Sequence, residues 1–486
     1  MNTELVDILL EKNEWQTFDC KRAVIKPAKL LETIVAFANT DGGMVVLGLE
    51  DPDKEDEDQR IVGISEHPDN VSEVLKLMGK EIDPPLPKVE DSEIEVKNRD
   101  NVDDKLLILR VQKSNDVHSL KNGDTFVRKG RQNCKIGAVE IQRLQYEKGI
   151  RKYEDEVSNT DNLNEINRSL LGQFKKDTKG TGDDWQFLKD NGLAIKRGDR
   201  YFLTKSGVLL FGNNPTIQLK SKCGIKVTHY FGVTPTYSGE PNFVEKPFTI
   251  EGPLINQIQQ ALDYFRVVVK KSPPKLRGAS FKPSLFIPEW AFQEAITNAV
   301  IHRNYSIEND IQLRFFDDRI EIESPGTYPG HITVSNIRTE RYARNPIMQR
   351  TLNRFQESPN LDIGEGVDRM FKIMKENNLY EPLFISPSLK PNSVVLILLN
   401  IQRIGYWDTV SKYLDENFLI SSQDARNITG VNDSVAMSRL FKTWVEKGLL
   451  EKIGRSKKAA HYKKPGSEVP RGLFSKALKI KYNRQK

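Results

Sequence analysis

Along the 486-residue chain, apolar and polar positions follow a helical repeat most clearly at residues 289–305. The segment follows Pro288 and contains no internal Gly or Pro, which predicts a helix. On one face of this helix, Glu294, Asn298 and His302 recur every fourth residue. A carboxylate, an amide and an imidazole beside a buried stripe predict a binding site. The apolar stripe consists of Phe292, Ala295, Ile296, Ala299 and Val300.

The same patterns predict strands and helices elsewhere, and they indicate a multidomain α/β (α+β) protein. Short apolar runs bounded by turn residues predict buried strands, and the stretch Leu254–Val269 is amphipathic at helical spacing. The predicted strands are Met44–Leu49, Ile61–Ile64, Leu106–Val111, Ile225–Tyr230, Phe248–Ile250, Ile311–Phe316, Ile320–Glu323, Leu383–Ser386 and Ser393–Leu399, and Thr125–Gly130 is predicted to be a strand that runs into a turn. The expected domains are residues 1–145, a linker and connector at 146–250, a nucleotide-binding domain at 251–402, a winged helix at 403–465 and a basic tail at 466–486.

Composition narrows the class of protein. Charged residues make up 29% of the chain, and no apolar run reaches the length of a membrane helix. Three cysteines far apart form neither a disulfide framework nor a zinc site, which favours a reducing cytoplasm. The net charge is only +6, but no acid follows Glu468 while six Lys and Arg residues do. Such a tail is typical either of phosphate contact or of a solvated chain end.

Two motifs near the N-terminus resemble the Schlafen/AlbA-type domain. They are Glu14-Trp-Gln-Thr-Phe-Asp-Cys-Lys21 and the longer run from Ala36 to Asp51, which contains Ala-Phe-Ala-Asn-Thr-Asp-Gly-Gly. In ribonuclease members of this family, three carboxylates at these places hold a divalent metal that cleaves RNA. The resemblance implies that Glu14, Asp19 and Asp51 bind Mg²⁺ or Mn²⁺, with Lys21 beside them.

Oxygen ligands suit these cations, which activate water and neutralise phosphate. Two departures from the family pattern are Asp at position 19, where the family has Glu, and Cys20, where it has Phe. The alternative is that these acids are structural or surface groups of a domain that binds nucleic acid without cutting it. Lys21 then serves as the internal partner of the acids, whereas in a nuclease it holds the scissile phosphate.

Three segments, in their order along the chain, resemble the nucleotide pocket of GHKL ATPases. They are the helix at 289–305, the turn Ser324-Pro-Gly326 and the glycine loop at 362–370. The nearer resemblance is to the branch found in helicase-related bacterial regulators. It implies ATP as a ligand, Asn298 as a Mg²⁺ ligand and Glu294 as the group that orients the attacking water. Arg303, Ser324, Gly326, Gly364 and Gly366 complete the implied nucleotide site.

Adenine recognition departs from the usual pattern. Typical members use an Asp in D-x-G, whereas this chain has Ser324 in that place, with Glu323 next to it. Ser324, Glu323 or a water takes over that contact, or the preference for one base is relaxed. A domain that keeps the fold only as a scaffold is the remaining alternative.

Residues 404–464 have the pattern of a winged helix, with a third helix at Asp433–Lys447 followed by a wing. Its candidate nucleic-acid contacts are Arg439, Lys442, Arg455, Lys457 and Lys458. Many winged helices bind protein instead of DNA. Two hypotheses for the whole chain follow. One is an ATP-gated, metal-dependent endoribonuclease, by analogy a component of bacterial anti-phage defence. The other is a non-catalytic, ATP-binding transcriptional regulator. Both are expected to be homo-oligomers.

Overall fold

The computed structural model describes most of the chain. The described residues are 6, 9–10, 14–55, 57–87, 89–236, 239–271, 274–277, 280–283, 285–359, 365–385, 390, 392–403, 405–453 and 460–465. Gly364, Arg455, Lys457, Lys458 and the basic tail at 466–486 therefore lie outside the described residues. The chain divides into a first unit, residues 1–148 with 405–486, and a second unit, residues 149–404. Within the described residues, no helix has the length and apolar character needed to cross a bilayer.

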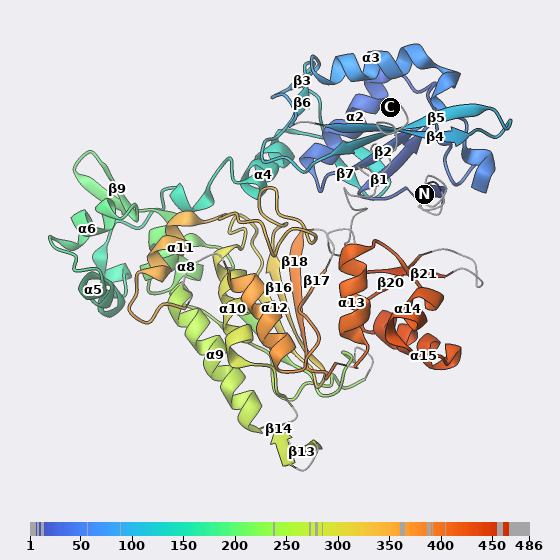
Figure 1. The fold of residues 1–486 in the computed structure, drawn as a ribbon. Coiled ribbons are helices and arrows are strands. Elements are labelled where there is room, and N and C mark those ends of the chain that lie inside the picture. Colours follow the sequence, from blue (N-terminus) through green and yellow to red (C-terminus); the bar gives the residue numbers. More distant parts are fainter. Residues whose placement is uncertain are drawn as a thin grey trace. The chain divides into compact units, whose positions relative to one another are not determined.

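The N-terminal domain of the first unit is built around a four-stranded sheet with the order β1-β2-β5-β4 (Figure 1). Strands β1 and β2 are parallel, so the chain must cross over between them, and helix α2 makes that connection. The other strands of this sheet are antiparallel to their neighbours. The bounds are β1 Phe18–Lys21, α2 Pro27–Asn39, β2 Gly43–Leu47, β4 Glu90–Lys97 and β5 Asp103–Val111.

The Asn-Thr-Asp-Gly-Gly run that begins at Asn39, the last residue of α2, has a structural role. Asn39 is buried, donates to the carbonyls of His118 (2.7 Å) and Phe126 (2.9 Å), and accepts from the amide of His118. Gly43 lies against the ring of Phe37, since a Cβ at Gly43 would come within 2.9 Å of that ring. The motif thus joins the end of α2 to the sheet and to the following strands.

The remaining elements of this domain cover the sheet and its edges. The predicted strand at Ile61–Ile64 is reduced to one bridge between Leu49 and Ile61. The bounds are η1 Glu57–Arg60, η2 Ile64–Glu66, α3 Pro68–Met78, β3 Ile82–Asp83, β6 Ser119–Leu120, β7 Thr125–Lys129, β8 Gln132–Ile136 and α4 Ala138–Lys148.

The described residues 405–453 and 460–465 form three helices and a three-stranded antiparallel sheet with the order β19-β21-β20. Helix α14 begins with a capping box between Ser421 and Asp424. The core of α15 consists of Met437, Phe441 and Trp444, all buried. These elements agree with the expected ones, and the assignment as a winged helix stays a prediction. The bounds are α13 Trp407–Glu416, β19 Ile420–Ser421, α14 Ser422–Thr429, α15 Ser434–Glu446, β20 Glu451–Ile453 and β21 His461–Lys463.

The second unit contains a six-stranded sheet with the order β12-β11-β15-β16-β18-β17. Strand β11 is parallel to β15 and antiparallel to β12, so the sheet extends across the domain boundary predicted at residue 250. Helices α9, α10 and α12 lie together on one face of this sheet (Figure 1). One apolar core runs from Ile166 to Leu398 and includes residues of the predicted connector. The connector and the predicted nucleotide-binding domain therefore fold as one unit.

Helix α10, Glu289–Ile301, coincides closely with the helix predicted from the apolar stripe. The bounds of the elements before it are η3 Tyr153–Asp155, η4 Leu163–Glu165, α5 Arg168–Asp177, α6 Asp184–Asp190, β9 Ala194–Arg197, β10 Arg200–Leu203, α7 Lys205–Phe211, α8 Pro215–Leu219, β11 Ile225–His229, β12 Phe248–Ile250, α9 Leu254–Lys271, β13 Pro274–Arg277 and β14 Ser280–Pro283. Those after it are β15 Ile311–Phe315, β16 Arg319–Pro325, α11 Pro346–Asn353, α12 Gly366–Glu376, β17 Leu383–Phe384 and β18 Ser393–Leu399.

Candidate functional site

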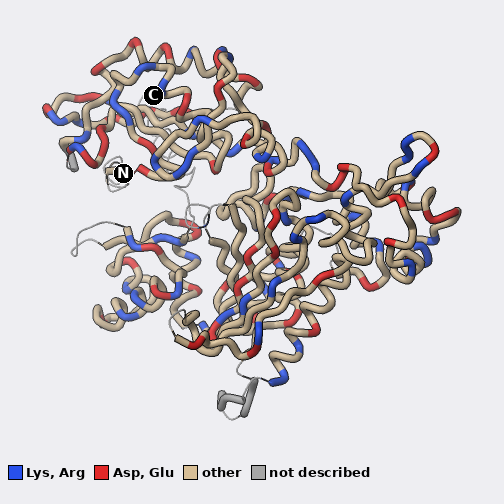
Figure 2. The backbone as a smooth tube through the Cα atoms, turned by 180° about the vertical axis from the view of Figure 1, so that it is seen from behind, with Lys and Arg blue, Asp and Glu red and all other residues tan. Residues whose placement is uncertain are grey.

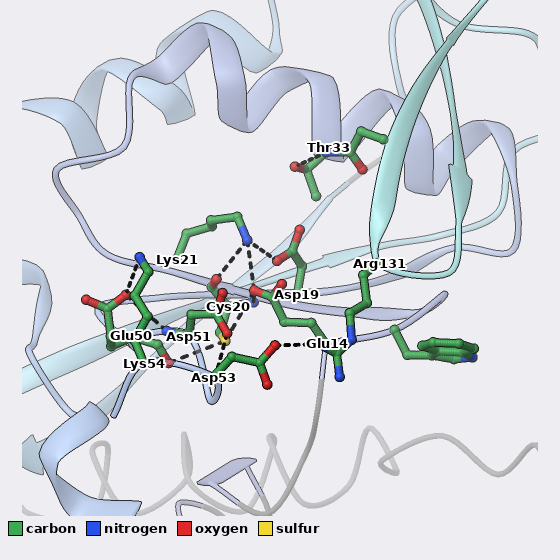
Figure 3. A network of polar contacts seen from close by, with 12 residues as sticks. Glu14, Asp19, Cys20, Lys21, Thr33, Glu50, Asp51, Asp53, Lys54 and Arg131 are labelled. Atoms are coloured by element: carbon green, nitrogen blue, oxygen red, sulfur yellow. Dashed lines mark hydrogen bonds and ion pairs between the residues drawn. The ribbon is translucent and has the colours of Figure 1, made fainter. Parts of the chain in front are cut away.

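The first candidate site is a cluster of charges at strand β1. Asp19 and Lys21 leave the strand on the same face because they are two residues apart. The Lys21 ammonium binds Glu14 Oε1 at 2.8 Å and also binds Asp19 Oδ1 (Figure 3). The other oxygen of Asp19 accepts from the guanidinium of Arg128 at 3.0 Å, and both side chains are 1% exposed. Two acids and two bases thus neutralise one another in this cluster.

The acids of the cluster titrate together. Burial and the hydrogen bond with Glu14 raise the pKa of Asp19 above its ordinary value. Burial opposes ionisation of Glu14 as well, but its hydrogen bonds with Asp19 and Lys21 outweigh burial and lower the pKa of Glu14. Burial and the nearby Glu14 raise the pKa of Cys20 to about 12, so this thiol stays protonated. The cluster is an internal ion-pair network.

Asp51 does not join this network in the way predicted. Its carboxylate accepts from the amide of Asp53 at 2.9 Å, which is a local turn contact. Figure 3 shows the adjoining group of Glu50, Asp53 and Lys54, which meets the cluster at Cys20. Among the described residues, no three His, Cys, Asp or Glu side chains are placed to hold a metal ion. Lys21 binds one oxygen of Glu14, and Lys21 and Arg128 bind the two oxygens of Asp19, so the structure does not bring Glu14, Asp19 and Asp51 together as a metal group, and their role as metal ligands stays a prediction.

The second candidate site is a cavity of about 580 Å³ in the second unit. Its walls include α10, the segment 328–343 and the first residues of α12. The sheet supplies an apolar surface, since Ile322 pairs with Leu396 and Ser324 pairs with Val394, and all four line the cavity. Ala295, Ala299, Met370 and Phe384 extend that surface. A flat apolar surface with few polar groups is typical of a pocket for an aromatic ring.

Glu294 and Asn298 both line the cavity, as their spacing predicts. The amide nitrogen of Asn298 donates to Glu294 Oε1 at 2.8 Å, which leaves the amide oxygen of Asn298 available as an acceptor. Burial raises the pKa of Glu294. The carboxylate lies against the first turn of α12, because a Cβ at Gly366 would come within 1.7 Å of Glu294 Oε1. A side chain at position 366, which the sequence assigned to the same site, would therefore displace the carboxylate of Glu294.

Three arginines line the cavity and were missed from the sequence. They are Arg338, Arg341 and Arg369. The guanidinium of Arg369 lies 4.5 Å from the ring centre of Trp290, and that of Arg338 pairs with Asp368 at 2.7 Å. Arginine side chains beside a helix N-terminus form an environment that favours a polyphosphate. Arg338 and Arg341 lie in a segment to which no role was assigned from the sequence, and Arg369 lies in the predicted glycine loop and helix at 362–370, where only the glycines were assigned to the site.

Two other predicted contacts are corrected by the structure. Arg303 is buried, donates to the carbonyls of Lys222 (2.6 Å), Ile307 and Asn309, and is not among the residues that line the cavity. It organises the loop after α10 and does not reach a phosphate in the cavity. Gly326 also lies outside the cavity lining. Its φ of +111° and the 2.7 Å separation between a Cβ there and Asn304 Cβ explain why the turn requires glycine.

Of the two residues considered for recognition of the base, Glu323 and Ser324, Ser324 lines the cavity. Glu323 points to the other face of β16 and binds Arg314 at 2.8 Å, so it does not line the cavity. Ser324 lines the cavity, but its hydroxyl donates to the carbonyl of Ala299 at 2.8 Å. His302 also lines the cavity, and burial, together with the nearby Arg344, lowers its pKa to about 4. A neutral imidazole and a serine oxygen are thus available there.

Comparison with protein families finds matches for two separate segments of the chain. Residues 14–137 match the family described as Schlafen, AlbA_2. Residues 308–398 match the family described as putative ATP-dependent DNA helicase recG C-terminal. A solved structure, the DIP2311 protein from Corynebacterium diphtheriae, is 17% identical, with a TM-score of 0.42 over 96% of this chain and 94% of that one. The search of curated proteins finds no match.

The two matched segments correspond to the two candidate sites. The first contains the charge cluster at β1, and the second contains the sheet surface and the segment 328–343 that line the cavity, whereas α10 precedes the second match. Domains of these two types suggest a nucleic-acid-related, ATP-dependent protein. The chain is therefore a multidomain α/β protein in which a Schlafen/AlbA_2-type domain precedes an ATPase-like domain of the recG C-terminal type.

Proposed function

We propose that the protein is a nucleotide-responsive regulator, which binds ATP in the cavity of the second unit and binds nucleic acid through its other domains. The observation that carries this proposal is the cavity itself. It combines Glu294 and Asn298, one helical turn apart, with three arginines and the N-terminus of α12. The positive charge of the arginines and the helix N-terminus favours the negative charge of a polyphosphate, and the apolar sheet surface suits the ring of a nucleotide base.

The residues of the cavity fit a Mg²⁺ ion that arrives with the nucleotide. Asn298 offers one neutral oxygen, because its nitrogen is engaged by Glu294. Bound Mg²⁺ would neutralise charge on the phosphates and leave them to supply most of its ligands. Glu294, whose pKa is raised by burial, is the group placed to orient a water and accept its proton.

The N-terminal domain supports the regulator better than the metal-dependent ribonuclease. Glu14 and Asp19 are already neutralised by Lys21 and Arg128, so the cluster does not need a cation. The described residues therefore do not fit a divalent metal as they stand, and we derive no cleavage step from them. Homo-oligomerisation, a cytoplasmic location and a role in defence against phage stay predictions.

Replacing Asn298 with alanine tests the nucleotide site. We expect the Kd for ATP in the presence of Mg²⁺ to rise roughly 10- to 100-fold, because a ligand of the metal and the hydrogen bond that orients Glu294 are both lost. Isothermal titration with and without Mg²⁺ measures this effect. Thr297→Ala, a change of a neighbouring buried residue that does not line the cavity, is the control. Equal affinities for Asn298→Ala and wild type would contradict the assignment.

Gly366 provides a second test of the same geometry. A methyl group at this position collides with the carboxylate of Glu294, so Gly366→Ala should displace Glu294. We expect ATP turnover to fall roughly 10²-fold, the cost of a displacement of about 1 Å in a catalytic group. A smaller change should follow from Gly405→Ala, where a Cβ meets no atom within 4 Å. An unchanged rate of phosphate release in Gly366→Ala would show that Glu294 does not act there.

Binding of duplex DNA should depend steeply on salt. Arg439 and Lys442 are exposed on α15, and Lys442 pairs with Glu446 at 3.7 Å. Figure 2 shows Asp and Glu interspersed among Lys and Arg along the backbone, so we expect contact with only a few phosphates. Neutralising Z phosphates gives a slope of about −0.9Z in a plot of log K against log salt. We expect the double change Arg439→Gln and Lys442→Gln in the full chain to reduce this slope by about 2. An identical slope in the variant, measured by fluorescence anisotropy, would count against DNA contact by α15.

A further inference from the structure

Two buried charged residues stand where the first unit continues into the second. Lys148 is the last residue of α4, and its ammonium donates to the carbonyls of Ala38, at 3.0 Å, and Ser114. Burial lowers the pKa of Lys148 to about 7. Glu154 follows a few residues later in η3, and it is 0% exposed. A charged group is costly to bury unless it is hydrogen-bonded or paired. The hydrogen bonds of Lys148 and Glu154 are therefore costly to break, and they hold the chain in place at both residues.

Glu154 holds the beginning of helix α11. One carboxylate oxygen accepts from the amide of Ile347 and the other from the amide of Met348, each at 3.0 Å. These amides belong to the first turn of α11, where N–H groups have no partner within the helix. A carboxylate at a helix N-terminus is also favoured by the helix dipole. Residues far apart in sequence are therefore joined by two hydrogen bonds to one side chain.

Gly149, the residue that follows α4, contacts the wall of the cavity. Its φ is +75°, and a Cβ at this position would lie 2.1 Å from the hydroxyl of Tyr342. Tyr342 lines the cavity and packs edge-on against the ring of His331, with 6.0 Å between the ring centres. The backbone of Gly149 thus lies directly against a side chain that a bound nucleotide would touch.

The helix that Glu154 holds is also tied to α10. Asn345 precedes α11, and its amide nitrogen donates to the carbonyls of Ile301 (2.7 Å) and Arg303 (2.9 Å) at the end of α10. Gln349 of α11 lines the cavity itself. A continuous set of contacts therefore runs from the helix with Glu294 and Asn298, through Asn345 and α11, to Glu154.

We propose that residues 149–154, the 149–154 linker, transmit occupancy of the cavity to the N-terminal domain. This inference rests on the proposed function and adds its regulation. A nucleotide that contacts Tyr342 and the arginines of the segment 338–343 shifts the start of α11 relative to the sheet. We expect the linker to follow, because Glu154 is hydrogen-bonded to the start of α11 and Gly149 lies against Tyr342. Lys148, the last residue of α4, is followed directly by Gly149 in the chain, so we expect α4 to respond to this displacement.

Hydrogen–deuterium exchange of the full-length chain tests the linker. With saturating ATP and Mg²⁺, we expect the exchange of amides in α4 to change about fivefold or more, the lower end of ordinary coupling between sites. Glu154→Gln keeps the shape of the side chain but places an NH₂ group against one of the two amides of α11. This variant should still bind ATP in isothermal titration and should lose most of the change in α4. Asp155→Asn removes the same charge from the exposed neighbouring residue and should behave as wild type.

Gly149→Ala gives an independent variant that is also usable if Glu154→Gln does not fold. Its methyl group displaces Tyr342 and should weaken the response of α4 in the same way. Absence of ATP binding to the wild-type protein would overturn the proposed function. ATP binding without a response in α4, or a response of wild-type size in either linker variant, would overturn the linker and leave the proposed function standing.

Discussion

Replacing Glu294 with glutamine is expected to lower the rate of ATP hydrolysis by about 10²- to 10⁴-fold, the usual contribution of a positioned general base. Glutamine keeps an oxygen that can accept from Asn298, so the Kd for ATP and Mg²⁺ should change little. Burial raises the pKa of Glu294, so the acid limb of the wild-type pH–rate profile should lie above the ordinary range of a glutamate. That limb should be absent from the variant.

Glu289→Gln is the matched control for this change. Glu289 lies in the first turn of the same helix, is exposed and pairs with Arg266 at 2.7 Å, away from the cavity lining. Phosphate release at saturating ATP measures the rates of both variants, and titration calorimetry measures their affinities. A Glu294→Gln protein that turns over as fast as Glu289→Gln would remove Glu294 from the mechanism. Nucleotide binding would then be the whole function of the cavity.

The part of the site that lies on one helix could be predicted from the sequence. Helical spacing alone sets Glu294, Asn298 and His302 on one face, and all three line the cavity. Most of the predicted strands also form, because buried strands such as Ser393–Leu399 are short apolar runs between turns, whereas β1 and β4 were not predicted. The extent of the second unit was not predicted, because the pairing of β11 with β15 joins segments that are distant in sequence.

The contacts that the sequence did not predict depend on tertiary structure. Arg303 follows His302 directly, and only the path of the loop after α10 turns it inward to backbone carbonyls. Arg341 and Arg369 come from separate segments and meet only at the cavity. The partner of Asp19 at the N-terminal site is Arg128, more than a hundred residues away in the chain. Spacing carries no information about such partners, whereas the resemblance suggested a metal in their place.

Replacing Arg128 with methionine is expected to lower the free energy of unfolding of the N-terminal domain by about 3–5 kcal/mol. Arg128 and Asp19 are both almost fully buried, and the guanidinium also binds Asn133 at 2.8 Å. Removal of Arg128 leaves one oxygen of the buried Asp19 carboxylate without its cation, while Lys21 still binds the other oxygen. Native-state hydrogen exchange of α2 and β2 measures the stability of this domain separately from that of the other parts of the chain.

Arg131→Met provides the control, because Arg131 pairs with Asp53 at 2.5 Å with both side chains exposed. Exposed pairs contribute about 0–1 kcal/mol, so this variant should stay within that range of wild type. A loss in Arg128→Met no larger than in Arg131→Met would contradict the ion-pair network.

The same measurement separates the network from a metal site. A cation that binds the folded domain stabilises it by RT ln(1 + [L]/Kd), which is about 2.7 kcal/mol at a concentration of 100 Kd. Glu14 and Asp19 already share Lys21, and Asp19 also binds Arg128, so Mn²⁺ should not stabilise the wild-type domain measurably. In Lys21→Met the two acids lose their shared cation, and Mn²⁺ should then recover part of the lost stability. Stabilisation of the wild-type domain by Mn²⁺, together with cleavage of RNA, would instead restore the metal-dependent ribonuclease, with Lys21 displaced from its carboxylates when the metal binds.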